Sequence, residues 1–99
     1  MRAKLVALYK EPDDPAAFDK RYFEGHLPLI EKIPGLQSTT ITRFGKVLAG
    51  DGFYLMSEMY FADMDALKAA LRTPEMAATG EDIQQFGGHL MTLLIAEEA

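Results

Sequence analysis

The stretch FYLMSEMYF, residues 53–61, decides the fold of this 99-residue chain. It contains neither glycine nor proline, and aromatic and long apolar side chains of this kind favour a β-strand. Because successive side chains of a strand point to opposite sides, one face carries four apolar residues, namely Phe53, Leu55, Met59 and Phe61. The other face carries Tyr54, Met56 and Tyr60 around Glu58. The segment therefore predicts a strand with apolar side chains on both faces.

Three further strands are predicted on either side of this one. Residues 37–47 are rich in threonine and alternate in polarity, which indicates a half-exposed strand. The turn Gly50-Asp51-Gly52 joins that strand to residues 53–61 as a hairpin. The short apolar segments Ala3–Tyr9 and Leu90–Ala96 predict the first and the last strand.

A first helix is predicted to begin near Pro15, because Asp14 is a suitable N-cap and proline is well tolerated at the first helical position. Residues of one helix face then recur at helical spacing, namely Phe18, Tyr22, Gly25, His26 and Leu29. Pro28 offers no N–H, and its ring clashes with the preceding turn of a helix. We therefore expect the helix to end or kink just past His26, with a last turn before Pro34-Gly35.

A second helical region is predicted after the hairpin. Asp63 is the N-cap of a helix whose apolar face consists of Met64, Leu67, Ala70 and Leu71. Thr73-Pro74 repeats the combination of cap and proline, and it begins a shorter helical piece that Gly80 ends. Residues 81–88 are expected to form a loop.

These elements predict the order β-α-β-β-α-β in one α+β domain that spans residues 1–99. Right-handed connections in this order build a ferredoxin-like fold, a four-stranded antiparallel sheet with both helices on one face. The other face would expose apolar side chains to water, which is unfavourable for a monomer. We therefore expect two copies to pack sheet to sheet as a homodimer.

Composition and charge exclude several classes of protein. Ten Lys and Arg stand against fifteen Asp and Glu, and the positive charges are not grouped, so nucleic acid is not an expected partner. The longest apolar run, Leu5–Tyr9, is too short to span a membrane, and no secretory signal begins the chain. We therefore expect a cytoplasmic protein without a membrane partner. The chain has no cysteine, which excludes disulfides and thiolate nucleophiles.

His26 is the main candidate for chemistry, and Tyr22 lies one turn earlier on the same side of the helix. The pKa of a histidine lies near neutrality, which suits a general acid or base. In a purely structural role, the His26 ring would instead hydrogen-bond a backbone carbonyl where Pro28 disturbs the helix. The sequence alone leaves both roles open.

The remaining candidate site residues also have two readings. Glu58, held among apolar neighbours, is either a second acid or base that orients a substrate, or one half of an ion pair with a base such as Arg43, Lys4 or Arg2. The candidate ligand-binding residues are aromatic, namely Tyr9, Phe18, Tyr54 and Tyr60, and their alternative role is core packing. No nucleotide-binding, serine-hydrolase or metal-binding motif occurs, so we expect no cofactor and no metal ion.

A set of residues spread along the chain forms a recognisable pattern. Its first part consists of Leu8-Tyr9, Pro12, Asp14, Phe18, Tyr22, His26-Leu27-Pro28-Leu29 and Pro34-Gly35. Its second part consists of Glu58-Met59-Tyr60-Phe61, Met64, Ala66-Leu67, Thr73-Pro74, Asp82 and Phe86. This pattern resembles the EthD family over nearly the whole chain. The resemblance implies a member of the dimeric α/β-barrel superfamily, and hence again a homodimer.

The resemblance also implies kinds of activity. The namesake of the family is associated with the degradation of ethyl tert-butyl ether alongside a degradative oxidase system, and members are often labelled reductases. Similar proteins include methylmuconolactone methylisomerase, in which the histidine of the corresponding motif is thought to assist proton transfer. More distant relatives are cofactor-free monooxygenases, polyketide cyclases and haem-binding proteins. Methylisomerase chemistry has been linked to cysteines, which this chain lacks, so His26 stays the main candidate.

We therefore expect each subunit to hold a pocket between sheet and helices that binds a small apolar or aromatic molecule. His26 would transfer a proton, and Tyr22 or Glu58 would orient the substrate, in an isomerisation, a cyclisation or a cofactor-free oxidation. One alternative is a non-catalytic binding or accessory module for a degradative oxidase system. Another is a structural dimer in which His26 only completes the end of a helix.

Overall fold

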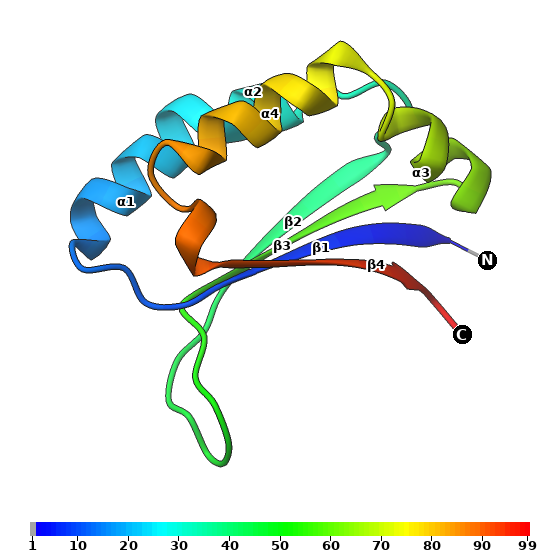
Figure 1. The fold of residues 1–99 in the computed structure, drawn as a ribbon. Coiled ribbons are helices and arrows are strands. Elements are labelled where there is room, and N and C mark those ends of the chain that lie inside the picture. The colour runs from blue at the N-terminus through cyan, green and yellow to red at the C-terminus, as the bar shows by residue number, and fades with distance from the viewer. Residues whose placement is uncertain (1) are drawn as a thin grey trace.

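The fold is built on a four-stranded antiparallel sheet in the order β2-β3-β1-β4, in a computed structural model that describes residues 2–99. Its strands are β1 (Ala3–Tyr9), β2 (Ser38–Arg43), β3 (Leu55–Phe61) and β4 (Met91–Glu97). Helices α1, α2 and α4 lie over one face of the sheet (Figure 1). The predicted ferredoxin-like β-α-β-β-α-β arrangement is confirmed.

The strand β1 is central and pairs with β3 on one side and β4 on the other. Its helix-facing side chains, such as Leu5 and Tyr9, lie opposite Met59 and Leu55 of β3. The predicted hairpin strands were too long, because residues 44–54 form a connecting loop. Gly50 in this loop adopts φ +80°, a conformation that glycine tolerates best. The loop projects past the sheet on the side away from the helices (Figure 1).

The first helical segment does not end at His26: a π-helical turn stops at that residue, where an end or a kink was predicted, and one last turn follows before Pro34-Gly35 as expected. It consists of α1 (Pro15–Arg21), the π-helix η1 (Tyr22–His26) and α2 (Leu27–Ile30). The backbone N–H of Leu27 donates to the carbonyl of Tyr22, five residues back. This wider turn accommodates the ring of Pro28, which would clash with the carbonyl of residue 24 in a regular α-helix.

The second helical region consists of α3 (Met64–Ala70) and α4 (Pro74–Gln84), which are capped as predicted. Asp63 Oδ1 accepts from the N–H of Ala66 at 2.8 Å, and Thr73 Oγ1 accepts from the N–H of Met76 at 3.2 Å. The prediction that Gly80 ends the helix was wrong. A glycine inside a helix costs only about 1 kcal/mol relative to alanine, and the burial of Ile83 outweighs this cost. A short 3-10 turn, η2 (Gly88–Leu90), then leads into β4.

The buried side chains between helices and sheet form two clusters. One lies beneath α2 and α3 and contains Leu5, Ile30, Ile33, Met59, Phe61 and Leu67. The other lies beneath α1, η1 and the end of α4 and contains Ala7, Tyr9, Phe18, Tyr22, Leu55 and Ile83. The two clusters adjoin along β1 and β3, so a cavity at their border would lie near the middle of the space between the sheet and the helices.

Candidate functional site

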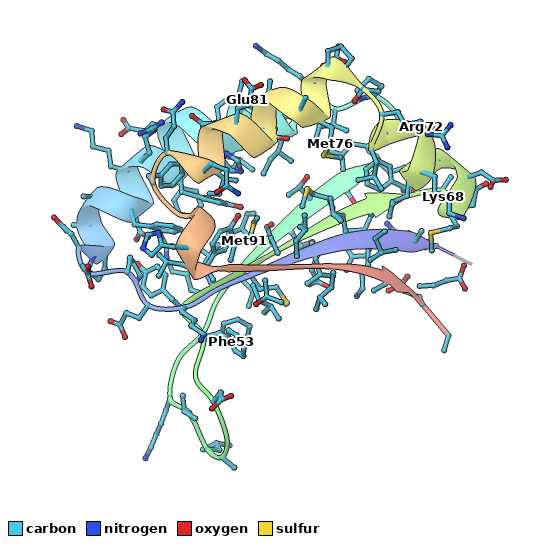
Figure 2. All side chains as sticks on the ribbon, viewed as in Figure 1. Phe53, Lys68, Arg72, Met76, Glu81 and Met91 are labelled. Carbon is cyan, nitrogen blue, oxygen red and sulfur yellow. The ribbon has the colours of Figure 1, made fainter. Side chains whose placement is uncertain are left out.

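A cavity of about 150 Å³ lies between the sheet and the helices. Its walls include Leu5, Ile30 and Met59 from the first cluster and Tyr9 and Ile83 from the second, so both clusters border the cavity. Figure 2 shows two further wall residues, Met76 on the sheet side of α4 and Met91 at the start of β4. Leu71 and Leu93, which are partly exposed, also line it, and they place its opening at the edge strand β4. The expected pocket between sheet and helices is therefore present.

His26 lines this cavity at the end of the π-helical turn and is 4% exposed. Its Nδ1 lies 3.0 Å from Oδ2 of Asp82 on α4. The other carboxylate oxygen of Asp82, Oδ1, accepts a hydrogen bond from Arg21 Nη2 at 3.0 Å. Arg21 also donates to Gln85 Oε1 at 2.9 Å and lies over the ring of Phe86. The chain Arg21–Asp82–His26 thus connects α1, the end of α4 and the cavity.

The electrostatics of this chain leave His26 neutral near pH 7. Burial lowers the pKa of His26 below its ordinary value of 6.5, although the hydrogen bond and the charge of Asp82 oppose the shift. Burial alone would raise the pKa of Asp82, but the hydrogen bonds from Arg21 and His26 outweigh it and lower that pKa. An ionised carboxylate only accepts hydrogen bonds, so Nδ1 of His26 carries the hydrogen. Nε2 is then the nitrogen that remains for a ligand.

Tyr22 and Phe18 lie beside the cavity rather than in its wall. The Tyr22 ring packs 5.2 Å from the His26 ring, 5.7 Å from Tyr9 and 5.8 Å from Phe18, measured between centroids. Of the four predicted ligand-binding aromatics, only Tyr9 lines the cavity. Tyr54 lies at the other side of this aromatic group, where its hydroxyl donates to Asp19 Oδ1 at 2.7 Å.

Glu58 and Tyr60 are not brought together with His26. They alternate along β3 with Ser57 and Met59, which line the cavity, and therefore lie on the opposite face of the sheet. Glu58 Oε2 accepts from Lys4 Nζ at 2.8 Å and from the Tyr60 hydroxyl at 3.3 Å. Of the three bases considered from the sequence, Lys4 is thus the partner of Glu58.

Two residues of the site were missed from the sequence alone, Asp82 and Ser57. Asp82 belongs to the EthD-like pattern, but the loop predicted over residues 81–88 gave no reason to place it beside His26, whereas α4 extends to Gln84. Ser57 lines the cavity from β3 and is 1% exposed. A signal for it existed, because Ser57 is the one polar residue on the otherwise apolar face of the stretch FYLMSEMYF.

Residues 2–99 were also searched for a metal-binding cluster and for a membrane-spanning helix. Within this range, no group of three or more His, Asp and Glu side chains is placed to hold a metal ion. No helix in the same range has the length and apolar character needed to cross a membrane.

The fold and the cavity define a ferredoxin-like α+β protein with a buried histidine paired to a half-buried aspartate. The model of the EthD domain matches residues 10–88, so the chain belongs to the EthD family. It is 48% identical to an EthD family protein from Bacillus halodurans, with full coverage of both chains and a TM-score of 0.93. It is 31% identical to an 11.0 kDa protein from the thcB-thcC intergenic region of Rhodococcus erythropolis, over 96% of this chain and 93% of that protein.

More distant solved structures share the fold. A mutant form of SnoaB, a cofactor-independent oxygenase from Streptomyces nogalater, superposes with a TM-score of 0.69 at 15% identity, over 98% of this chain and 92% of that one. A dimeric ferredoxin-like protein from Thermobifida fusca superposes with a TM-score of 0.71 at 16% identity, over 99% and 92%. At these identities the similarity concerns the fold alone.

Proposed function

We propose that this protein binds a small, largely apolar molecule in the cavity and that His26 exchanges a proton with it. The observation that carries the proposal is the 3.0 Å contact between His26 Nδ1 and Asp82 Oδ2, because it leaves Nε2 as an unprotonated base at an apolar cavity. Enzymes that use general base catalysis require a base of this kind, held by a fixed partner.

The walls of the cavity favour an uncharged ligand. Among the residues that the structure describes, no Lys, Arg, Asp or Glu lines it, so a bound carboxylate or phosphate would lose its hydration without gaining a counter-ion. An apolar cavity of about 150 Å³ is large enough for a single six-membered ring. The partly exposed Leu71 and Leu93 allow a ligand to enter past β4.

The proton transfer needs only residues of this chain. When Nε2 accepts a proton, His26 becomes a cation, and the carboxylate of Asp82 stabilises that cation. Arg21 keeps Asp82 ionised and oriented. Isomerisation, cyclisation and cofactor-free oxidation all begin with such a step. The shared fold of a cofactor-independent oxygenase supports chemistry of this type.

Binding is tested by following the NMR spectrum of the protein during titration with toluene, and in parallel with benzoate. We expect toluene, but not benzoate, to shift the resonances of residues that line the cavity. The variant Met76→Trp fills the cavity and should abolish the shifts, whereas Ala77→Trp, at an exposed position of the same helix, should retain them. Toluene leaving the wild-type spectrum unchanged would argue against any ligand site here.

The state of the base is tested by ¹⁵N NMR of the imidazole groups at pH 7. We expect His26 to be neutral, with its hydrogen on Nδ1 and none on Nε2. If His26 instead carried its hydrogen on Nε2, it could not act as a base toward the cavity. Toluene binding combined with that result would favour a non-catalytic binding module.

We also propose that two copies pack through the face of the sheet that the helices leave open. Val6, Leu8, Met56 and Leu94 lie on this face, and Leu94 is 45% exposed. The loop of residues 44–54 projects on the same side (Figure 1), and its Leu48 is 92% exposed. Apolar groups left in water at these positions favour association. The description of a protein with the same fold as dimeric supports the proposal.

A further inference from the structure

Three hydroxyl groups gather at one end of the cavity. Ser57 on β3 pairs with Ala7 of β1, and its side chain lies on the same face of the sheet as Tyr9. The next pair on that face is Tyr9–Leu55. Ser57 and Tyr9 both line the cavity. The hydroxyl of Tyr22 lies close enough to the hydroxyls of both residues to change its pKa. The remainder of the wall toward Met59, Met76 and Leu71 is apolar apart from Thr79, whose hydroxyl donates to the carbonyl of Met76 at 2.6 Å.

Two of these hydroxyls have no partner. Within residues 2–99, neither Ser57 Oγ nor Tyr22 Oη forms a hydrogen bond, although both atoms are buried. Buried polar groups in folded proteins are nearly always hydrogen-bonded. Ser57 lines the cavity, but its Oγ has almost no surface exposed there, so the side chain must turn to direct this free hydrogen-bonding capacity to a bound molecule.

The hydroxyls are suited to donate hydrogen bonds while keeping their own protons. Burial raises the pKa of Tyr9, and the neighbouring Tyr22 adds to the shift. Burial also raises the pKa of Tyr22, although Ser57 and Tyr9 oppose this. Both phenols therefore keep their hydrogens at neutral pH. A base on one side and hydroxyl donors on the other are the groups needed to remove a proton next to a carbonyl.

We propose that the cavity takes a neutral, ring-sized carbonyl compound with a C–H bond next to the carbonyl, whose oxygen Ser57 and Tyr9 hold while His26 removes the proton. This deepens the proposed function and rests on it. The C–H proton passes to Nε2 of His26, and its electron pair forms the C=C bond of an enolate. The carbonyl π pair moves onto the oxygen, where the two hydroxyls stabilise it. Return of the proton to the same or another carbon completes exchange or isomerisation without any oxidant or reductant.

The test uses cyclohexanone in D₂O and follows the replacement of its C2 hydrogens by deuterium with ¹H NMR. We expect wild-type protein to accelerate exchange over buffer, and His26→Ala to lose the acceleration. Loss of one donor to a developing oxyanion costs on the order of 100-fold in rate, so Ser57→Ala and Tyr9→Phe should each show a decrease of that order. Methylcyclohexane, which has the ring but no oxygen, should bind Ser57→Ala and wild type equally, which shows that the variant is folded.

The outcomes separate this inference from the proposed function. The proposed carbonyl site is wrong if the wild-type protein binds cyclohexanone and methylcyclohexane with equal affinity. It is also wrong if Ser57→Ala catalyses the exchange of cyclohexanone as fast as the wild type. Toluene binding and the His26 tautomer would still support the broader proposal in that case. If no neutral ring compound binds, both are wrong. Exchange that persists in His26→Ala would overturn the assignment of the base.

Discussion

The two faces of the sheet each carry an acid–base pair, and the two pairs differ in what they leave free. On the open face, Lys4 Nζ and Glu58 Oε2 lie 2.8 Å apart, and Tyr60 donates to the same oxygen. On the helix face, His26 and Asp82 lie 3.0 Å apart. The Lys4–Glu58 pair is a closed ion pair on the face that the helices leave open. The His26–Asp82 pair uses only one ring nitrogen of a histidine that lines the cavity.

Pairing alone does not mark a reactive group. The charge on Lys4 is satisfied by its partner, and the hydrogen bond to Glu58 raises the pKa of Lys4, so this group stays protonated. Burial lowers the pKa of His26 despite its partner, so that group stays a free base. The difference comes from burial and from the second nitrogen of the imidazole ring.

The strongest test of the comparison substitutes neighbouring residues of β4 that face opposite sides. Because each copy contributes the same residue, Leu94→Glu would place two carboxylates in the proposed interface. Burying these unpaired charges should cost about several kcal/mol of association free energy. We expect light scattering at micromolar concentration to show a monomer. Leu93→Glu, on the cavity side, should leave the dimer intact. A wild-type protein that scatters as a monomer would contradict the proposed pairing.

The second test removes the acid of each pair. Asp82→Asn deprives the His26 cation of its counter-charge, and we expect the exchange rate of cyclohexanone to fall on the order of 100-fold. Titration of His26 by NMR should show a still lower pKa, because the raising effect of Asp82 is lost.

The matching change on the open face is Glu58→Gln. Because Glu58 lies across the sheet from His26, we expect the exchange rate and the His26 titration to stay as in the wild type. A parallel loss in both variants would show that the two faces are coupled.

A third test concerns the unpartnered hydroxyl of Ser57. Removing a buried polar group that lacks a partner restores about 1 kcal/mol or more, so Ser57→Ala should raise the Tm by about 4–8 °C. Ser38→Ala, at an exposed position of β2, should not change the Tm. A lower Tm for Ser57→Ala would mean that the hydroxyl is satisfied within the fold.

The smallest expected effect is the pH dependence of stability. The folded protein lowers the pKa of His26, so below about pH 6.5 the unfolded chain binds more protons than the folded one. The free energy of unfolding should therefore decrease as the pH falls from 6.5 through the folded pKa. Urea unfolding between pH 5 and 8 measures this slope, and His26→Gln should flatten it. If wild type and His26→Gln showed the same slope, the pH dependence of the unfolding free energy would come from groups other than His26.

The parts of the fold that local sequence determines were predicted well. The caps at Asp14, Asp63 and Thr73 are contacts over three residues, and the apolar alternation in residues 55–61 needs no distant partner. The end of α4 was missed because Arg21 and Asp82, which join it to α1, are 61 residues apart. Which pairs form across such distances is set by the folded structure, not by local pattern.

In the candidate site, too, local features could be predicted from the sequence and distant pairings could not. His26 stood out because its residue type and helical position are visible in the sequence. Glu58 was grouped with it because alternation separates the two faces of a strand without saying which one the helices cover. That choice depends on how β1, β3 and the helices pack together. The partner of His26 followed only once α4 was seen to continue past Gly80.

The π-helical turn gives the first helical segment one more residue than its core contacts require. Phe18 and Ile30 are twelve positions apart and both are buried, whereas three regular α-helical turns take up about 11 residues. The wide turn absorbs the difference and brings both side chains back into phase toward the sheet. A chain shortened by one residue here would keep that phase as a regular α-helix only if Pro28, whose ring clashes in such a helix, were also replaced. The surplus residue therefore lies in the one turn that carries Tyr22 and His26, where a change in length is expected to alter the site before it alters the core.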